Sequence, residues 1–158
     1  MWEKLLEIII NIMLKIFGYK SEDSKGIVFN NITTKQMTGH SGFANVTQPL
    51  LVSCHEDGGS VFVEFCGRND VPYGVYVPES FVADGNKVMI QLLGNGIVKM
   101  VSGGTIKKGQ IVYSSGSGEI TATPNAGEKY YSVGIALEDG VRGNLVKVDT
   151  SSPVSVTA

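Results

Sequence analysis

The chain has 158 residues, of which 42% are hydrophobic and 18% are charged, and its formal net charge is −2. These values are typical of a globular protein of one domain with a short appendage. The acidic balance argues against nucleic-acid binding, because proteins of that class carry a basic surface. The 20 glycines are spread along the chain and predict many tight turns, since average proteins contain about 7% glycine.

Residues 1–18 are predicted to form an amphipathic α-helix. Glu7, Asn11 and Lys15 recur every four residues, which places them on one narrow stripe, and large apolar residues occupy most of the remaining surface. The helix is short for a membrane span, because residues 2–17 would cover about 24 Å of a ~30 Å hydrocarbon layer. The polar residues that interrupt the apolar run also argue against a secretion signal.

The apolar face of this helix predicts an interface. A helix that packs on one partner needs only a narrow apolar seam, whereas this helix needs contact around most of its circumference. We expect it to self-associate, as a trimer because its seam is rich in isoleucine, or to insert into a groove on a partner protein. The alternatives are packing on the chain's own sheet and binding to a membrane surface. The predicted interface residues are Trp2, Leu5, Leu6, Ile9, Ile10, Met13, Leu14, Ile16 and Phe17.

Residues 19–26 are predicted to form a polar linker, and residues 27–149 are predicted to form a β-rich domain. Short runs of β-branched residues alternate with turn signals, which is typical of a mainly β fold: a small barrel or sandwich with hairpin turns. Residues 150–158 are predicted to form a polar tail that either adds a strand to the edge of a neighbouring sheet or frays. The predicted strands are 27–30, 50–54, 60–66, 74–77, 87–92, 96–101, 110–114, 119–123, 131–137 and 144–149.

Part of the β-rich domain occurs twice. Residues 74–79 (GVYVPE) resemble residues 134–138 (GIALE), and each run is followed by a Gly-Asn pair and an alternating strand, at residues 85–90 and 143–148. A unit of strand, loop and strand is therefore repeated. This duplication indicates a pseudo-symmetric barrel, because it is too faint and too short for a solenoid.

No residue pattern indicates catalysis, a metal or a cofactor. His40 and His55 are the two histidines, and no nucleophile-elbow, phosphate-loop or metalloprotease motif is present. A zinc site made from them with Cys54 and Cys66 would have unusual spacing, and the adjacent residues Cys54 and His55 face opposite sides of a strand. Across a hairpin that turns at residues 57–59, the two thiols fall about 13 Å out of step. We therefore expect free thiols and no enzyme activity.

The chain from residue 72 to residue 149 resembles a known family. The runs that carry the resemblance are residues 104–113 (GTIKKGQIVY), 118–123 (GEITAT), 131–138 (YSVGIALE) and 143–148 (GNLVKV). Their order is similar to that in the C-terminal part of the small head decoration proteins, or capsid cement proteins, of tailed bacteriophages. Residues 74–93 resemble an earlier copy of the same element in that family.

The resemblance implies a β-barrel-like domain, often trimeric, that binds the major capsid protein at three-fold or quasi-three-fold positions. It implies a structural virion protein that is made in the host cytoplasm and stabilises or decorates the outer capsid surface. The N-terminal helix departs from the family, whose members usually begin with a short extended arm. The helix therefore leaves three modes of docking open: joining the trimer, anchoring in the capsid, or holding another head component, as in the base of a head fibre.

A second hypothesis is a β-rich binding module, displayed through the N-terminal helix, that recognises a glycan or a protein. Tyr73, Tyr76, Tyr130 and Tyr131 are the aromatic residues expected to be exposed and to line its groove. A third hypothesis is a small hydrolase that uses His40 or His55.

Overall fold

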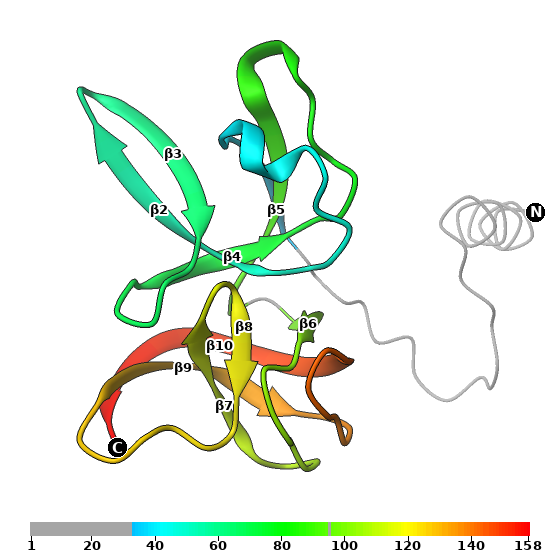
Figure 1. Cartoon of the computed structure of the whole chain (residues 1–158), viewed down its shortest axis with the longest axis vertical. Helices are drawn as coiled ribbons and strands as arrows, with labels where there is room; N and C mark the ends of the chain where they lie inside the picture. The colour runs from blue at the N-terminus through cyan, green and yellow to red at the C-terminus, as the bar shows by residue number, and fades with distance from the viewer. Residues whose placement is uncertain (1–32, 95) are drawn as a thin grey trace, which may run out of the picture.

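Strands dominate the computed structural model, which describes residues 33–94 and 96–158 (Figure 1). The elements of these residues are β1 (Thr34–Thr38), the 3-10 turn η1 (Ser41–Phe43), β2 (Leu51–Asp57), β3 (Ser60–Phe65), β4 (Pro72–Tyr76), the 3-10 turn η2 (Asp84–Asn86), β5 (Lys87–Leu92), β6 (Gly96–Val101), β7 (Ile111–Gly116), β8 (Glu119–Thr121), β9 (Lys129–Ala136) and β10 (Leu145–Thr157).

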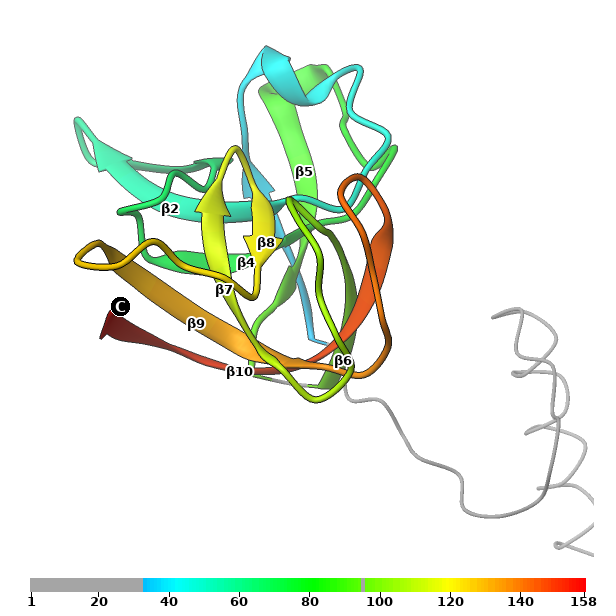
Figure 2. The same cartoon turned by 60° about the horizontal axis from the view of Figure 1, so that its bottom comes forward.

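The strands form two sheets that follow one another in the sequence. β1 to β5 close into a barrel in the order β1-β3-β2-β4-β5, and β6 to β10 form a five-stranded sheet in the order β6-β10-β9-β7-β8. We call residues 34–92 unit 1 and residues 96–157 unit 2. Figures 1 and 2 show unit 1 stacked on unit 2, with the β7–β8 hairpin reaching up to unit 1.

The two units have the same topology. From β3, unit 1 has the order β3-β2-β4-β5-β1, and from β8, unit 2 has the order β8-β7-β9-β10-β6. A parallel pairing of Thr38 with Phe62 closes the barrel of unit 1, and a parallel bridge between Ser102 and Ile120 lies at the corresponding place in unit 2. The duplication that the sequence indicates for two strands therefore extends over five.

The pairing registers of the two units also correspond. In unit 1, Leu51 on β2 lies opposite Val75 on β4, and an irregularity in the pairing follows after the next residue. In unit 2, Ile111 on β7 lies opposite Ile135 on β9, and the same irregularity follows at the same point. Leu51 is therefore equivalent to Ile111, and Val75 is equivalent to Ile135.

Gly74 and Gly134 occupy equivalent positions on β4 and β9, and both lie too close to the neighbouring strand for a side chain. A Cβ atom on Gly74 would lie 2.6 Å from the carbonyl oxygen of Gln91. A Cβ atom on Gly134 would lie 2.8 Å from Cγ1 of Val148 and would collide with the carbonyl oxygen of Asp149. The glycine that begins each copy of the sequence repeat is thus required by the same close approach of strands.

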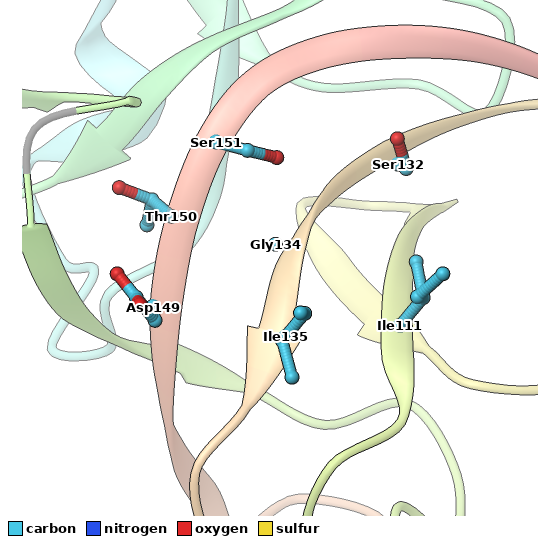
Figure 3. A pocket seen from close by; sticks show the side chains of 7 residues that line it. All are labelled: Ile111, Ser132, Gly134, Ile135, Asp149, Thr150 and Ser151. Atoms are coloured by element: carbon cyan, nitrogen blue, oxygen red, sulfur yellow. The ribbon is translucent and has the colours of Figure 1, made fainter.

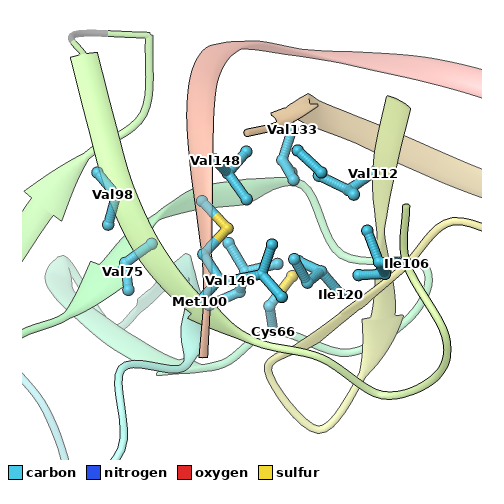
Figure 4. Packing of buried hydrophobic residues seen from close by; sticks show 12 residues of the cluster. Cys66, Val75, Val98, Met100, Ile106, Val112, Ile120, Val133, Val146 and Val148 are labelled. Atoms are coloured by element: carbon cyan, nitrogen blue, oxygen red, sulfur yellow. The ribbon is translucent and has the colours of Figure 1, made fainter. Parts of the chain in front are cut away.

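Two clusters of buried side chains form the core. The first fills the barrel of unit 1 and consists of Met37, Phe43, Val52, Val63, Tyr76, Val88 and Ile90. The second lies on the inner face of unit 2 (Figure 4). It also contains three residues of unit 1, namely Leu51, Cys66 and Val75. Successive strand residues point to opposite faces, so β2 and β4 bury one set of side chains inside the barrel and the other set against unit 2.

The predicted fold class needs correction. A mainly β chain was expected to form one small barrel or sandwich behind one N-terminal helix, but it forms a closed barrel and a second sheet, because each copy of the repeat builds a sheet of its own. In residues 33–94 and 96–158 there is no α-helix, and helical turns are limited to η1 and η2. The helix predicted for residues 1–18, the linker at 19–26 and the strand at 27–30 lie outside the described residues.

Several strand boundaries differ from the prediction. The ranges 87–92 and 96–101 coincide with β5 and β6, but β1 was not predicted. Residues 150–157, expected to be a tail, form the second half of β10, and residues 154–157 pair with residues 129–132 of β9. The small, polar side chains of this segment do not indicate a strand. The segment is a strand because its backbone pairs with β9.

Candidate functional site

The interface predicted at residues 2–17 lies outside the described residues, and the candidate sites that the structure describes lie in units 1 and 2. In the part of the chain that the structure describes, no helix has the length and apolar character needed to cross a membrane.

Ser53, His55 and Asp70 form a polar cluster at the surface of unit 1. The Oγ atom of Ser53 lies 2.8 Å from Nε2 of His55 and 3.5 Å from the Asp70 carboxylate, which also accepts a hydrogen bond from the N–H of Gly67. In a Ser-His-Asp triad the carboxylate orients the histidine, whereas here it contacts the serine. Ser53 is also only 2% exposed, which closes its hydroxyl to a substrate. The cluster satisfies a buried hydroxyl and lacks the geometry of a triad.

The structure keeps the four candidate zinc ligands apart. Nε2 of His40 lies 3.2 Å from the Glu64 carboxylate at the surface, and His55 belongs to the cluster with Ser53. Cys54 and Cys66 are free, the first exposed and the second buried. Within units 1 and 2, no group of three or more histidine, cysteine or acidic side chains is placed to hold a metal ion.

The exposed aromatic groove expected for a binding module is not formed. Tyr76 is fully buried in the barrel, where its hydroxyl donates a 3.4 Å hydrogen bond to the carbonyl oxygen of Phe43, and Tyr130 is only 3% exposed. Tyr73 and Tyr131 remain partly exposed, and each has a lysine ammonium over its ring. The prediction that Tyr76 and Tyr130 are exposed was wrong, because the strand pairing turns both rings inwards.

Arg68 joins the two units. Its guanidinium donates a 2.7 Å hydrogen bond to the Glu128 carboxylate and lies over the ring of Tyr130, both of which belong to unit 2. Glu128 also accepts hydrogen bonds from the Tyr130 hydroxyl and the Asn125 amide. The pKa of Glu128 is lowered, chiefly by the bond from Tyr130, then by that from Asn125, with a smaller contribution from Arg68. This cluster is a polar contact between the two units at the surface.

An apolar surface lies on the outer face of unit 2. Ile111 and Ile135 lie side by side on β7 and β9, and they are 50% and 48% exposed (Figure 3). They line a depression of about 300 Å³, which we call the Ile111–Ile135 face. Its residues are Ile111, Ser132, Gly134, Ile135, Asp149, Thr150 and Ser151.

The sequence alone does not single out this face, although the repeat contains a signal for it. When the two copies are aligned at Gly74 and Gly134, Val75 corresponds to Ile135, so both copies carry a β-branched apolar residue at the same position. The pairing register shows that Leu51 and Ile111 are equivalent as well, because Leu51 lies opposite Val75 and Ile111 lies opposite Ile135. A position that is apolar in both copies but buried in only one of them becomes recognisable only when the packing of the units is known.

Comparison with solved structures shows what the fold resembles. No protein-family model matches the chain, and no curated protein matches it. Among solved structures, the chain is similar to the head fiber gp8.5 N base of bacteriophage phi29, with a TM-score of 0.57 and 19% sequence identity. The similarity covers 77% of this chain and 95% of that one. At this identity we take from it the fold alone.

Proposed function

We propose that the chain is a structural component of a tailed-bacteriophage head, which binds the outer surface of the capsid as a homotrimer and stabilises or decorates it. The observation that carries this proposal is the fold shared with a phage head fiber base over 95% of that chain. The sequence resemblance of residues 72–149 to head decoration proteins supports the same role. The major capsid protein is the proposed partner, and the virion is the proposed location.

The physical demands of such a role fit the described surface. A protein that coats a shell needs extended complementary surfaces repeated by symmetry, and many modest contacts then give firm attachment. Units 1 and 2 expose several large apolar side chains, among them Val71, Val82 and Val141. A binding module for glycans is less well supported, because two of its four proposed tyrosines are buried.

A reconstitution experiment tests the proposal. The purified chain is mixed with heads of the phage that encodes it, prepared without the chain, and the mixture is sedimented through a gradient. We expect saturable co-sedimentation at a fixed ratio to the major capsid protein, and no further uptake by heads that already carry the chain. A chain that stays at the top of the gradient at every concentration would contradict a role on the capsid.

A further inference from the structure

One pair of equivalent positions is buried in unit 1 and exposed in unit 2. In unit 1, Leu51 and Val75 are fully buried, although they point out of the barrel that contains their neighbours Val52 and Tyr76. They are buried because they pack into the cluster on the inner face of unit 2 (Figure 4). The outer face of unit 1 is therefore a contact surface that another β-unit of the same construction covers.

In unit 2, the same positions have no such cover within the described chain. Ile111 and Ile135 point away from the cluster that contains Val112 and Ala136, and about half of each isoleucine side chain is exposed. Neither position has become polar, although an outward-facing strand position in contact with water is usually polar. Exposed large apolar side chains that gather on one surface indicate an interaction site.

The charges beside these residues suit contact between copies of the same chain. Lys147 and Asp149 lie two residues apart on β10, are both exposed and therefore share one side of the strand. Asp149 lies opposite Ile135, and the Lys147 ammonium also lies 3.9 Å from the Glu138 carboxylate of the same chain. A surface that carries both signs next to an apolar centre can place the acid of one copy near the base of another. A surface of a single sign would instead favour a partner of opposite charge.

We infer that the Ile111–Ile135 face is the contact between copies of this chain, with a second copy as its occupant. The basis is the chain's own precedent: the equivalent face, formed by Leu51 and Val75, is already bound by a β-unit of the same topology. The inference rests on the self-association in the proposed function and assigns that contact to a surface. It does not depend on attachment to a capsid.

Sedimentation equilibrium of the full chain over a wide concentration range tests the inference. Ile135→Lys places a charge in the apolar centre, and we expect it to weaken self-association by about tenfold or more. The matched control is Val61→Lys, because Val61 on β3 is also 50% exposed but lies in unit 1. The control should associate as the unmodified chain does. Circular dichroism and thermal melting establish that each variant is folded.

A second variant serves if Ile135→Lys fails to fold. The double change Ile111→Thr with Ile135→Thr keeps the β-branched shape and removes apolar surface, so it should preserve the strands and weaken association in the same direction.

The outcomes separate this inference from the proposed function. Association unchanged in both isoleucine variants would overturn the inference while leaving a trimer held by another surface. An equal loss in Val61→Lys would overturn it as well, because the effect would not be specific to the face. An unmodified chain that is monomeric at every concentration would overturn both the inference and the proposed homotrimer, whereas co-sedimentation with heads would still test the capsid role.

Discussion

Leu51 and Ile111 occupy the same position in two copies of one β-unit, yet Leu51 is 0% exposed and Ile111 is 50% exposed. The difference arises from packing between the units, since unit 2 covers the outer face of unit 1 and nothing in residues 33–94 and 96–158 covers the outer face of unit 2. Both positions carry a large apolar side chain, but only the side chain of Leu51 is removed from water by contact with the other unit.

This pair gives a direct prediction for stability. Leu51→Ala should lower the free energy of unfolding by about 2–5 kcal/mol, because it leaves a cavity in the cluster between the units. Ile111→Ala should cost clearly less, since half of its side chain is already in contact with water. Urea unfolding at dilute protein concentration measures both changes. Equal losses would contradict the assignment of Leu51 to the contact between units.

The equivalent glycines predict two matched losses of stability. Gly74→Ala and Gly134→Ala each push a methyl group into the neighbouring strand, so each should destabilise the fold by about 1–3 kcal/mol or more. Gly104→Ala is the control, because the nearest atom to its added Cβ lies 4.0 Å away. Thermal unfolding compares the three variants. Melting temperatures unchanged in Gly74→Ala or Gly134→Ala would show that the strands do not approach as closely as described.

The two thiols should differ in reactivity. Burial, together with the nearby negative charge of Asp70, raises the pKa of Cys66 to about 12, so this thiol stays protonated and enclosed at neutral pH. Cys54 is exposed. A disulfide reagent should modify Cys54 alone in the folded chain and both cysteines after denaturation, and Cys54→Ser should abolish the fast reaction. Rapid modification of Cys66 in the folded Cys54→Ser variant would contradict its burial.

The cluster at Glu128 predicts a pH dependence of stability. The pKa of Glu128 is lower in the folded chain, mainly because of the hydrogen bond from Tyr130, so its stabilising effect is present above the ordinary glutamate pKa. The effect is lost as the pH falls through the lowered pKa of the folded chain. Carboxyl NMR titration should show this lowered pKa, and Tyr130→Phe should raise it. The neighbouring Tyr131→Phe should leave it unchanged, and a response to Tyr131→Phe alone would contradict the described contacts.

The sequence predicted the β-rich body well because its signals are local. Turn residues and alternating apolar residues bound strands such as β5 and β6, and the repeat indicated the internal duplication. β1 was missed because the run Thr34–Thr38 contains one buried residue, Met37, and so lacks a clear alternation. The second half of β10 was missed because its order depends on pairing with β9.

The candidate surface could not be predicted in the same way. Tyr76 and Tyr130 were expected at the surface, but the sequence of a single strand does not reveal which of its faces is inside a barrel. The inner and outer faces of unit 1 are both apolar, since one fills the barrel and the other contacts unit 2. Only the relative placement of the two units shows that Ile111 and Ile135 stay exposed where the equivalent residues Leu51 and Val75 are buried.

The proposed capsid role is tested most directly by quantifying this chain in phage heads purified from the cells that produce it, relative to the major capsid protein. Our account predicts that the chain is present at a constant ratio in every preparation and remains with intact heads through gradient purification. Heads that contain no detectable chain, while the chain is abundant in the infected cell, would contradict the account.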